Sequence, residues 1–277
     1  MARGQYVGDD GHDVACKLTE HPGALIHAFW MPTKLLLGQY DMAYKSMLIS
    51  IEQTTQSRHV NSIGLAKSYA ALFLVERGHY DEALKACDDA INYAVENSLM
   101  IWQTNTLVIK GLVVSRLDRN ANGVEMARQG LSDWLATGVK VQAPQMQSYF
   151  AQACLFGGRI EEAEAALHAA FEIANETGEK WYSAELYRLQ GDVRLAQPPA
   201  LSSQAEDCYQ RALNLSRKQH AKTFELRAAI SLARLWAERG ERQRAHDLLA
   251  PIYGWFTEGF GCRDLVEAKA LLAALSA

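Results

Sequence analysis

The chain has 277 residues, of which 49% are hydrophobic and 22% charged, and it carries a formal net charge of −4 with a pI near 6.1. That balance gives no electrostatic reason to expect nucleic acid or an anionic membrane as a partner. No segment approaches the roughly 18 uninterrupted apolar residues of a membrane span, and the first residues lack the apolar core of a secretion signal.

Residues 1–20 are expected to form a flexible N-terminal arm. The densest group of potential metal ligands lies in and just after this arm: His12, Asp13, Cys16, His21 and His27. Their spacing fits no recognised zinc pattern, so we predict neither a metal nor another cofactor. Five cysteines lie far apart without a C-x-x-C pair, and we interpret them as reduced and structural in a cytoplasmic protein.

One motif recurs along the rest of the chain. GQYDMAY at 38–44 has a near copy in GHYDEAL at 78–84. Taking the alanine of each copy as an anchor, the steps along the chain are 40, 40, 40, 42 and 40 residues; the anchors are Ala43, Ala83, Gly123, Ala163, Ala205 and Ala245. Apolar or small residues follow each anchor at four and seven positions, which places all three on one face of a helix.

Each unit predicts a hairpin of two helices, A and B, as in residues 65–78 and 81–97. Pro22 suits the start of the first helix, and Pro32 is expected to kink or split it. In the fifth unit AQPPALSSQ at 196–204 replaces the tight turn, which explains the step of 42. Asp264 and Glu267 are expected to form a capping box at the start of a last helix that covers the sixth unit.

The sequence therefore predicts an all-α fold, a right-handed superhelical solenoid of about six hairpins with a period of 40 and a C-terminal capping helix. The repeat domain is expected to span 21–277. Its parts are expected at 21–59, 60–98, 99–139, 140–178, 179–220 and 221–260 for the repeats and at 263–276 for the capping helix.

The Gly, Tyr and Ala positions of GHYDEALKACDDAI resemble a tetratricopeptide (TPR) repeat, lengthened from that family's usual 34 or so residues. Residues 184–196, 205–240 and 250–275 more closely resemble the C-terminal repeat region of large bacterial signalling proteins. In that family the repeats follow a nucleotide-cyclase domain and a predicted ATPase domain, and similar repeats close LuxR-type transcription activators. The resemblance implies a role in bacterial signalling or regulation.

The catalytic activities of that family are not expected here. The sequence has no G-x-x-x-x-G-K-[ST] motif to hold phosphates, and nothing in it corresponds to a cyclase or DNA-binding module. H-E-x-x-H, G-x-S-x-G and G-x-G-x-x-G are also absent. We therefore predict a protein that is not an enzyme.

A binding surface is expected on the concave face, which helices A line in such an architecture. The candidates are polar or aromatic residues that share one stripe of helix A in the third, fourth and fifth repeats: Trp102, Asn105, Gln145, Ser148, Tyr149, Gln152, Trp181, Glu185, Arg188 and Asp192. Two alternatives remain open. The charged residues of the fifth repeat can form ion pairs with one another, and the tryptophans can belong to the core.

Other patterns are interpreted as structural. Residues 211–246 hold nine basic and three acidic side chains, but aromatic residues for base stacking are sparse there, which argues against nucleic acid. The aromatic run YGWFTEGF at 253–260 is assigned to the core. The Lys and Asn pair with which TPR domains hold a C-terminal carboxylate on helix A is missing, so a chaperone-tail clamp is not expected.

These observations together predict a non-catalytic scaffold or adaptor of bacterial signalling that binds a protein or peptide through the concave face. The alternative is a small-ligand or peptide sensor that regulates an ATPase, a cyclase or a transcription factor. That alternative predicts a concave pocket around Trp102, Tyr149 and Trp181.

Overall fold

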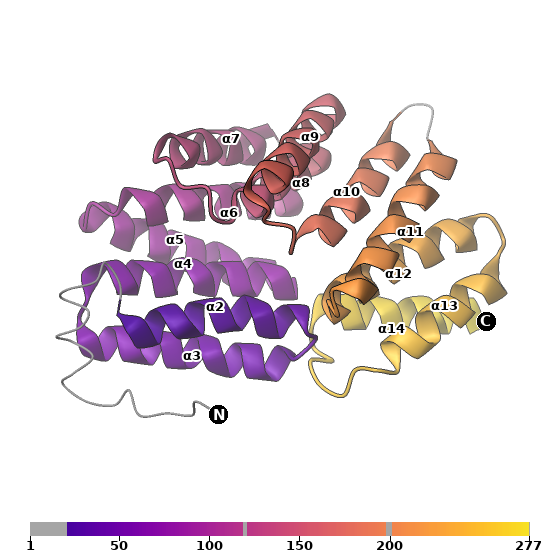
Figure 1. The fold of residues 1–277 in the computed structure, drawn as a ribbon, viewed down its shortest axis with the longest axis horizontal. Helices are drawn as coiled ribbons and strands as arrows, with labels where there is room; N and C mark the ends of the chain where they lie inside the picture. The colour runs from indigo at the N-terminus through magenta and orange to yellow at the C-terminus, as the bar shows by residue number, and fades with distance from the viewer. Residues whose placement is uncertain (1–20, 119–120, 198–200, 277) are drawn as a thin grey trace.

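The computed structural model describes residues 21–118, 121–197 and 201–276, and all regular secondary structure in these ranges is helical (Figure 1). The arm predicted at 1–20, with His12, Asp13 and Cys16, lies outside them. The helices are α2 (Pro22–Leu36), α3 (Tyr40–Ser57), α4 (Val60–Arg77), α5 (Tyr80–Glu96), α6 (Met100–Asp118), α7 (Ala121–Ala136), α8 (Ala143–Phe156), α9 (Ile160–Thr177), α10 (Ser183–Ala196), α11 (Ser202–Lys218), α12 (Lys222–Glu238), α13 (Arg242–Tyr253) and α14 (Arg263–Ser276).

Six antiparallel hairpins follow one another and α14 closes the series, so the predicted class of helical repeat fold is confirmed (Figure 1). The anchors explain why each hairpin forms. All five anchor alanines, such as Ala43 and Ala83, have no exposed surface. A small side chain at this position lets helix B lie close against helix A, and the buried residues one and two turns later extend that contact.

The third hairpin is the tightest, and its anchor is Gly123 in place of alanine. A Cβ atom at this position would lie 2.3 Å from Ser115 Oγ and 2.4 Å from the Ser115 backbone nitrogen. The backbones of α6 and α7 therefore approach too closely for an alanine without movement of the main chain. The exchange of alanine for glycine in the repeat has a steric cause.

Two predictions concern the ends and continuity of helices. Pro32 lies inside α2, which is one helix, so of the two outcomes expected for Pro32 the split does not occur. The predicted capping box at the start of α14 is wrong: α14 begins at Arg263, and the two carboxylates turn away from the helix end. Asp264 Oδ2 accepts from Arg227 Nε at 2.7 Å, and Glu267 pairs with Arg234. The two acidic residues therefore connect α14 to α12.

The two ends of the array meet, a contact that the repeat pattern does not contain (Figure 1). Thr223 Oγ1, at the start of α12, donates to the carbonyl oxygen of Leu35 at 2.5 Å. Glu258 accepts from the backbone N–H of Asp41 at 3.1 Å. We call this contact the seam; it joins residues 222–227 and 254–267 to residues 35–41 and 76–80. A solenoid whose units touch only their sequence neighbours is thereby closed into a ring.

Glycines of the repeated turn make the seam possible. Gly78 has a φ of 77°, and a Cβ there would lie 2.4 Å from Arg263 Cβ. At Gly38, with a φ of 74°, a Cβ would lie 2.7 Å from the ring of Phe256. The turn glycines of the first two repeats thus end a helix and also admit the C-terminal segment.

The aromatic run at 253–260 belongs only partly to the core. Phe256 is 5% exposed and its ring lies 6.2 Å from that of Tyr40, centroid to centroid. Trp255 and Phe260 are about half exposed, at 47% and 51%. The assignment of the whole run to the core is wrong, because the segment crosses the seam as a loop and buries one side.

Candidate binding pocket

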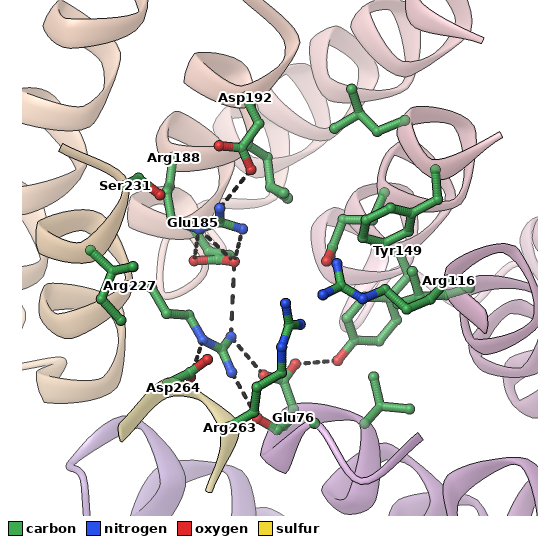
Figure 2. A pocket seen from close by; sticks show the side chains of 18 of the residues that line it. Glu76, Arg116, Tyr149, Glu185, Arg188, Asp192, Arg227, Ser231, Arg263 and Asp264 are labelled. Carbon is green, nitrogen blue, oxygen red and sulfur yellow. Dashed lines mark hydrogen bonds and ion pairs between the residues drawn. The ribbon is translucent and has the colours of Figure 1, made fainter. Parts of the chain in front are cut away.

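The hollow of the ring holds a pocket of about 320 Å³ (Figure 2). Helices A of repeats two to six line it, through α4, α6, α8, α10 and α12, and Tyr80 at the start of α5 and the first turn of α14 complete its wall. The pocket therefore exists only because the seam brings α14 back to the second repeat.

Arg227 lies at the centre of the first charged network in the wall. Its Nη1 atom lies 2.9 Å from Glu76 Oε2, its Nη2 donates to the carbonyl oxygen of Glu76, and its Nε donates to Asp264. Burial alone would lower the pKa of Arg227, but the neighbouring carboxylates, Asp264 first, hold it well above its usual value. One arginine of α12 thus holds α4 and α14 together by hydrogen bonds.

A second network is centred on α10, and Glu185 links it to Arg227 at 3.8 Å. Arg188 donates to both carboxylate oxygens of Glu185, the shortest bond being 2.7 Å, and to Asp192 at 2.6 Å. Burial opposes the charge of Arg188, yet Asp192 and Glu185 keep its pKa well above normal. Glu185 is 2% exposed, so this pair is far better shielded from water than a surface ion pair. Glu185, Arg188 and Asp192 thus form ion pairs with one another, which is one of the alternatives left open by the sequence.

Two tyrosines form the neutral part of the polar wall. Tyr149 donates its hydroxyl to Glu76 at 2.5 Å and accepts from the side-chain amide of Gln145. Tyr182 approaches the same carboxylate oxygen at 3.5 Å. Burial, followed by the charge of Glu76, raises the pKa of both hydroxyls well above the ordinary value. Both groups therefore stay protonated and act as hydrogen-bond donors.

The remaining lining includes aliphatic residues and two further arginines. Leu112, Leu155 and Ile230 contribute aliphatic surface. The guanidinium groups of Arg116 and Arg263 point into the middle of the pocket from α6 and α14 (Figure 2). The site thus combines charges of both signs with an aliphatic wall, which suits a ligand of mixed character.

The structure separates the predicted site residues into three groups. The residues that line the pocket are Tyr149, Gln152, Glu185, Arg188 and Asp192. Gln145 and Trp181 line a neighbouring cavity of about 20 Å³. The residues that line neither are Trp102, Asn105 and Ser148. Trp102 Nε1 donates to Asn61 at 2.7 Å, Asn105 accepts from Ser68 at 2.9 Å, and Ser148 is fully buried and donates to the carbonyl oxygen of Gln145 at 2.7 Å. Of the three residues predicted around a concave pocket, Tyr149 thus lines the cavity of about 320 Å³, and Trp102 and Trp181 do not.

The sequence analysis missed several residues that line the pocket, although their distances from the repeat anchors would have identified them. Gln145, Tyr149 and Gln152 precede their anchor by 18, 14 and 11 positions, and Arg227, Ser231 and Arg234 precede Ala245 by the same distances. Glu76 and Arg116 both stand seven positions before their anchors, one helical turn further along the same stripe. Extending the stripe to every repeat would have found them. Arg263, on α14, has no such register.

Metal and membrane sites were also sought. No group of three or more His, Cys, Asp or Glu side chains in the described ranges could hold a metal ion. Among the described helices, none combines the length and apolar character that a bilayer crossing requires. Four cysteines, Cys87, Cys154, Cys208 and Cys262, are free thiols.

No family model matches the sequence, and no characterised protein matches it significantly. Solved structures do. The crystal structure of NprR in complex with its cognate peptide NprX aligns over 91% of this chain and 71% of its own, with a TM-score of 0.64 and 14% identity. Aspartyl phosphate phosphatase F from Bacillus subtilis aligns over 83% of this chain and 58% of its own, with a TM-score of 0.59 and 15% identity. At these identities the likeness establishes a TPR-like helical repeat fold.

Proposed function

We propose that this protein is a non-catalytic regulator that binds a short peptide segment in the pocket of the ring, either a free peptide or the tail of a partner protein. The observation that carries the proposal is the pocket itself. Its walls come from five repeats and the final helix, and they present paired charges, tyrosine hydroxyls and aliphatic surface around about 320 Å³. That volume lies at the lower end of the range of about 300–1,000 Å³ for ligand sites.

The size of the pocket favours a peptide over a folded domain. Closure of the ring leaves space for a few side chains, whereas a standard protein interface needs about 800 Å² on each partner. The likeness to NprR supports the same choice, because NprR has the same kind of fold and was crystallised with a peptide. Binding of a peptide by a surface of repeats needs no covalent chemistry.

Catalysis is not part of the proposal. The carboxylates of the wall pair with arginines, and the tyrosine hydroxyls stay protonated, so the described lining offers no nucleophile activated by a neighbouring base. The second structural neighbour is named a phosphatase, but at 15% identity that activity does not transfer.

In this proposal a partner protein of bacterial signalling recognises the regulator when its peptide is bound. The resemblance of residues 184–275 to repeats that accompany cyclase, ATPase and LuxR-type domains suggests such a partner within the cytoplasm. Binding across the seam would stabilise the closed ring by mass action, which gives the partner a surface that depends on the ligand.

A selection of short random peptides displayed on phage or ribosomes tests the proposal. The wild-type protein is expected to enrich peptides, and a variant with the pocket filled, Ser231→Trp, is expected to lose them. Ser203→Trp provides the control, because Ser203 is exposed on α11 outside the pocket. Peptides that bind Ser231→Trp as well as wild type would place the site elsewhere.

A second candidate is a sensor for a small molecule that is not a peptide, and the modest volume of the pocket favours it. A thermal-shift screen of metabolites would reveal it. Stabilisation of wild type by a metabolite, lost in Ser231→Trp and kept in Ser203→Trp, together with no enriched peptide, would replace the peptide by that molecule.

A further inference from the structure

We propose that Arg116 and Arg263 bind a carboxylate of the ligand, and that this carboxylate joins the third repeat to the final helix. The inference rests on the proposed function, since it names the chemical group that the same pocket recognises. It concerns the two arginines whose guanidinium groups point into the middle of the pocket (Figure 2).

Arg116 stands in the last turn of α6, and its guanidinium lies against aromatic rings only. The centroids of the Phe156 and Tyr80 rings are 4.5 and 5.4 Å away. In the described part of the chain no carboxylate lies within ion-pairing distance of Arg116. The rings hold the guanidinium plane in position and leave its N–H groups for another acceptor.

Arg263 reaches the same ring as the first residue of α14. Its Nη1 donates to the hydroxyl of Tyr80 at 2.9 Å, and its Nε lies 3.7 Å from Glu267 Oε2, beyond hydrogen-bonding distance. The centroid of the Tyr80 ring is 5.7 Å from the guanidinium carbon of Arg263. Tyr80 therefore contacts both cations and holds them on one side of the pocket.

These two arginines differ from the other arginines of the wall. Arg188, Arg227 and Arg234 each have a carboxylate partner at close range among the lining residues. Arg263 has the longer ion pair of 3.7 Å to Glu267, whose carboxylate also pairs with Arg234. Two guanidinium groups held near one ring repel each other unless an anion lies between them. A planar guanidinium presents its donors in a fork that matches the two oxygens of a carboxylate or phosphate, and two such forks face the same space here.

The charge balance of the lining favours a carboxylate over a phosphate. Its charged residues are five arginines and five carboxylates: Arg116, Arg188, Arg227, Arg234, Arg263, Glu76, Glu185, Asp192, Asp264 and Glu267. Their formal charges cancel, so a carboxylate leaves one negative charge in excess, whereas a phosphate monoester leaves nearly two. Leu112 and Leu155 also line the pocket and suit an aliphatic side chain next to the anion.

This arrangement differs from the Lys and Asn pair of other TPR domains, which lies on helix A and is missing from this chain. One cation here comes from the end of a helix A and the other from α14, which reaches the pocket only across the seam. A bound carboxylate would therefore stabilise the closed ring as well as the ligand.

Nuclear magnetic resonance of the arginine Nε–H groups in the full chain provides the test, with N-acetyl-leucine, N-acetyl-leucinamide and inorganic phosphate as probes at millimolar concentration. N-acetyl-leucine is expected to shift the signals of Arg116 and Arg263 saturably, phosphate to act more weakly, and the amide to leave them unchanged. Equal shifts with the acid and the amide, or no saturable shift with the acid, would overturn the proposal. Tighter binding of phosphate would overturn the choice of carboxylate.

Variants then separate this inference from the proposed function. Arg116→Gln is expected to weaken binding of N-acetyl-leucine about tenfold or more, because it removes a charge-assisted pair of hydrogen bonds. Arg211→Gln, a change of an exposed arginine on α11, is expected to leave it unaltered. Selected peptides that bind Arg116→Gln as tightly as wild type would refute the inference and leave the peptide pocket standing. If N-acetyl-leucine shifts the signals of Arg116 and Arg263 saturably but no peptide is selected, the carboxylate site stands and the peptide pocket is refuted.

A further comparison shows whether the carboxylate belongs to the C-terminus of the peptide or to an acidic side chain. A selected peptide is compared in three forms: with a free C-terminus, with an amidated C-terminus, and with each Asp or Glu replaced by its amide. Loss of binding on amidation of the C-terminus assigns the site to the chain end, and loss on replacement of an acidic side chain assigns it to that residue. Binding by all three forms to the same degree contradicts the proposal.

Discussion

The junctions between neighbouring repeats and the seam between the two ends of the array use different contacts. At a junction such as that of the second hairpin, small and apolar residues like Ala83 and Cys87 are fully buried against the adjoining helix. At the seam hydrogen bonds and ion pairs accompany the packing of Phe256 on Tyr40: Thr223 bonds to Leu35, Arg227 to Glu76, and Arg263 to Tyr80. Burial of apolar surface sets the order of the repeats, and closure of the array adds a larger share of hydrogen bonds and ion pairs to such burial.

This difference bears on function because the pocket depends on the weaker kind of contact. Polar contacts gain less net free energy than apolar burial, and they respond to solvent conditions. The seam is therefore the part of the molecule that a ligand can favour or release at low energetic cost. The three predictions that follow separate the seam from the junctions, in order of the expected effect.

Removal of Arg227 should have the largest effect. Arg227→Met keeps most of the aliphatic stem but leaves the carboxylates of Glu76 and Asp264, which are 12% and 16% exposed, without their shared cation. Breaking such a buried network costs about 3–5 kcal/mol, and urea unfolding measures this free energy. Arg211→Met, on the exposed face of α11, should stay within about 0.5 kcal/mol of wild type. A change below about 1 kcal/mol for Arg227→Met would show that the seam does not rely on this network.

A pair of glycine substitutions isolates the steric part of the seam. Gly78 and Gly158 end equivalent helices A at φ values of 77° and 73°, so alanine at either position costs about 1 kcal/mol of backbone strain. At Gly158 a Cβ has nothing within 4 Å, whereas at Gly78 it would lie 2.4 Å from Arg263 Cβ. Gly78→Ala should therefore destabilise the fold by about 1 kcal/mol more than Gly158→Ala. Equal losses in thermal or urea unfolding would mean that the seam is not closed in solution.

The same contrast explains how far sequence analysis reached. A period of 40 residues records local packing, because each hairpin must bury its own apolar face on a neighbour; the anchors, the hairpins and the final helix follow from it. The seam joins residues such as Thr223 and Leu35 that are 188 positions apart. It occurs once, so no repetition marks it, and polar contacts leave no hydrophobic pattern to read.

The candidate site shows the same limit. The stripe on helix A led to Tyr149, Gln152 and the charged residues of α10, because helical spacing alone places them together. It also gave Trp102, because spacing along a helix does not tell which end of that helix lies beside the hollow of the ring. Arg263 could not be found in this way, since it reaches the pocket only through closure of the ring.

The most direct test of closure is the rate at which Cys262 reacts with iodoacetamide in native buffer, followed by mass spectrometry. Cys262 is 1% exposed in the seam, where Arg77 Nε lies 3.2 Å from its sulfur, and burial raises its pKa. Burial also raises the pKa of Cys87, in a junction, to about 12. Cys208, on α11, is only partly buried.

A closed ring predicts that Cys262 reacts far more slowly than Cys208 at low salt. Added salt, which screens the charges of the seam, should accelerate Cys262 and leave Cys87 unaffected. If Cys262 instead reacts as fast as Cys208 at low salt, the array is an open superhelix in solution. The wall that α14 contributes to the pocket would then be absent, which contradicts a binding site built by closure of the ring.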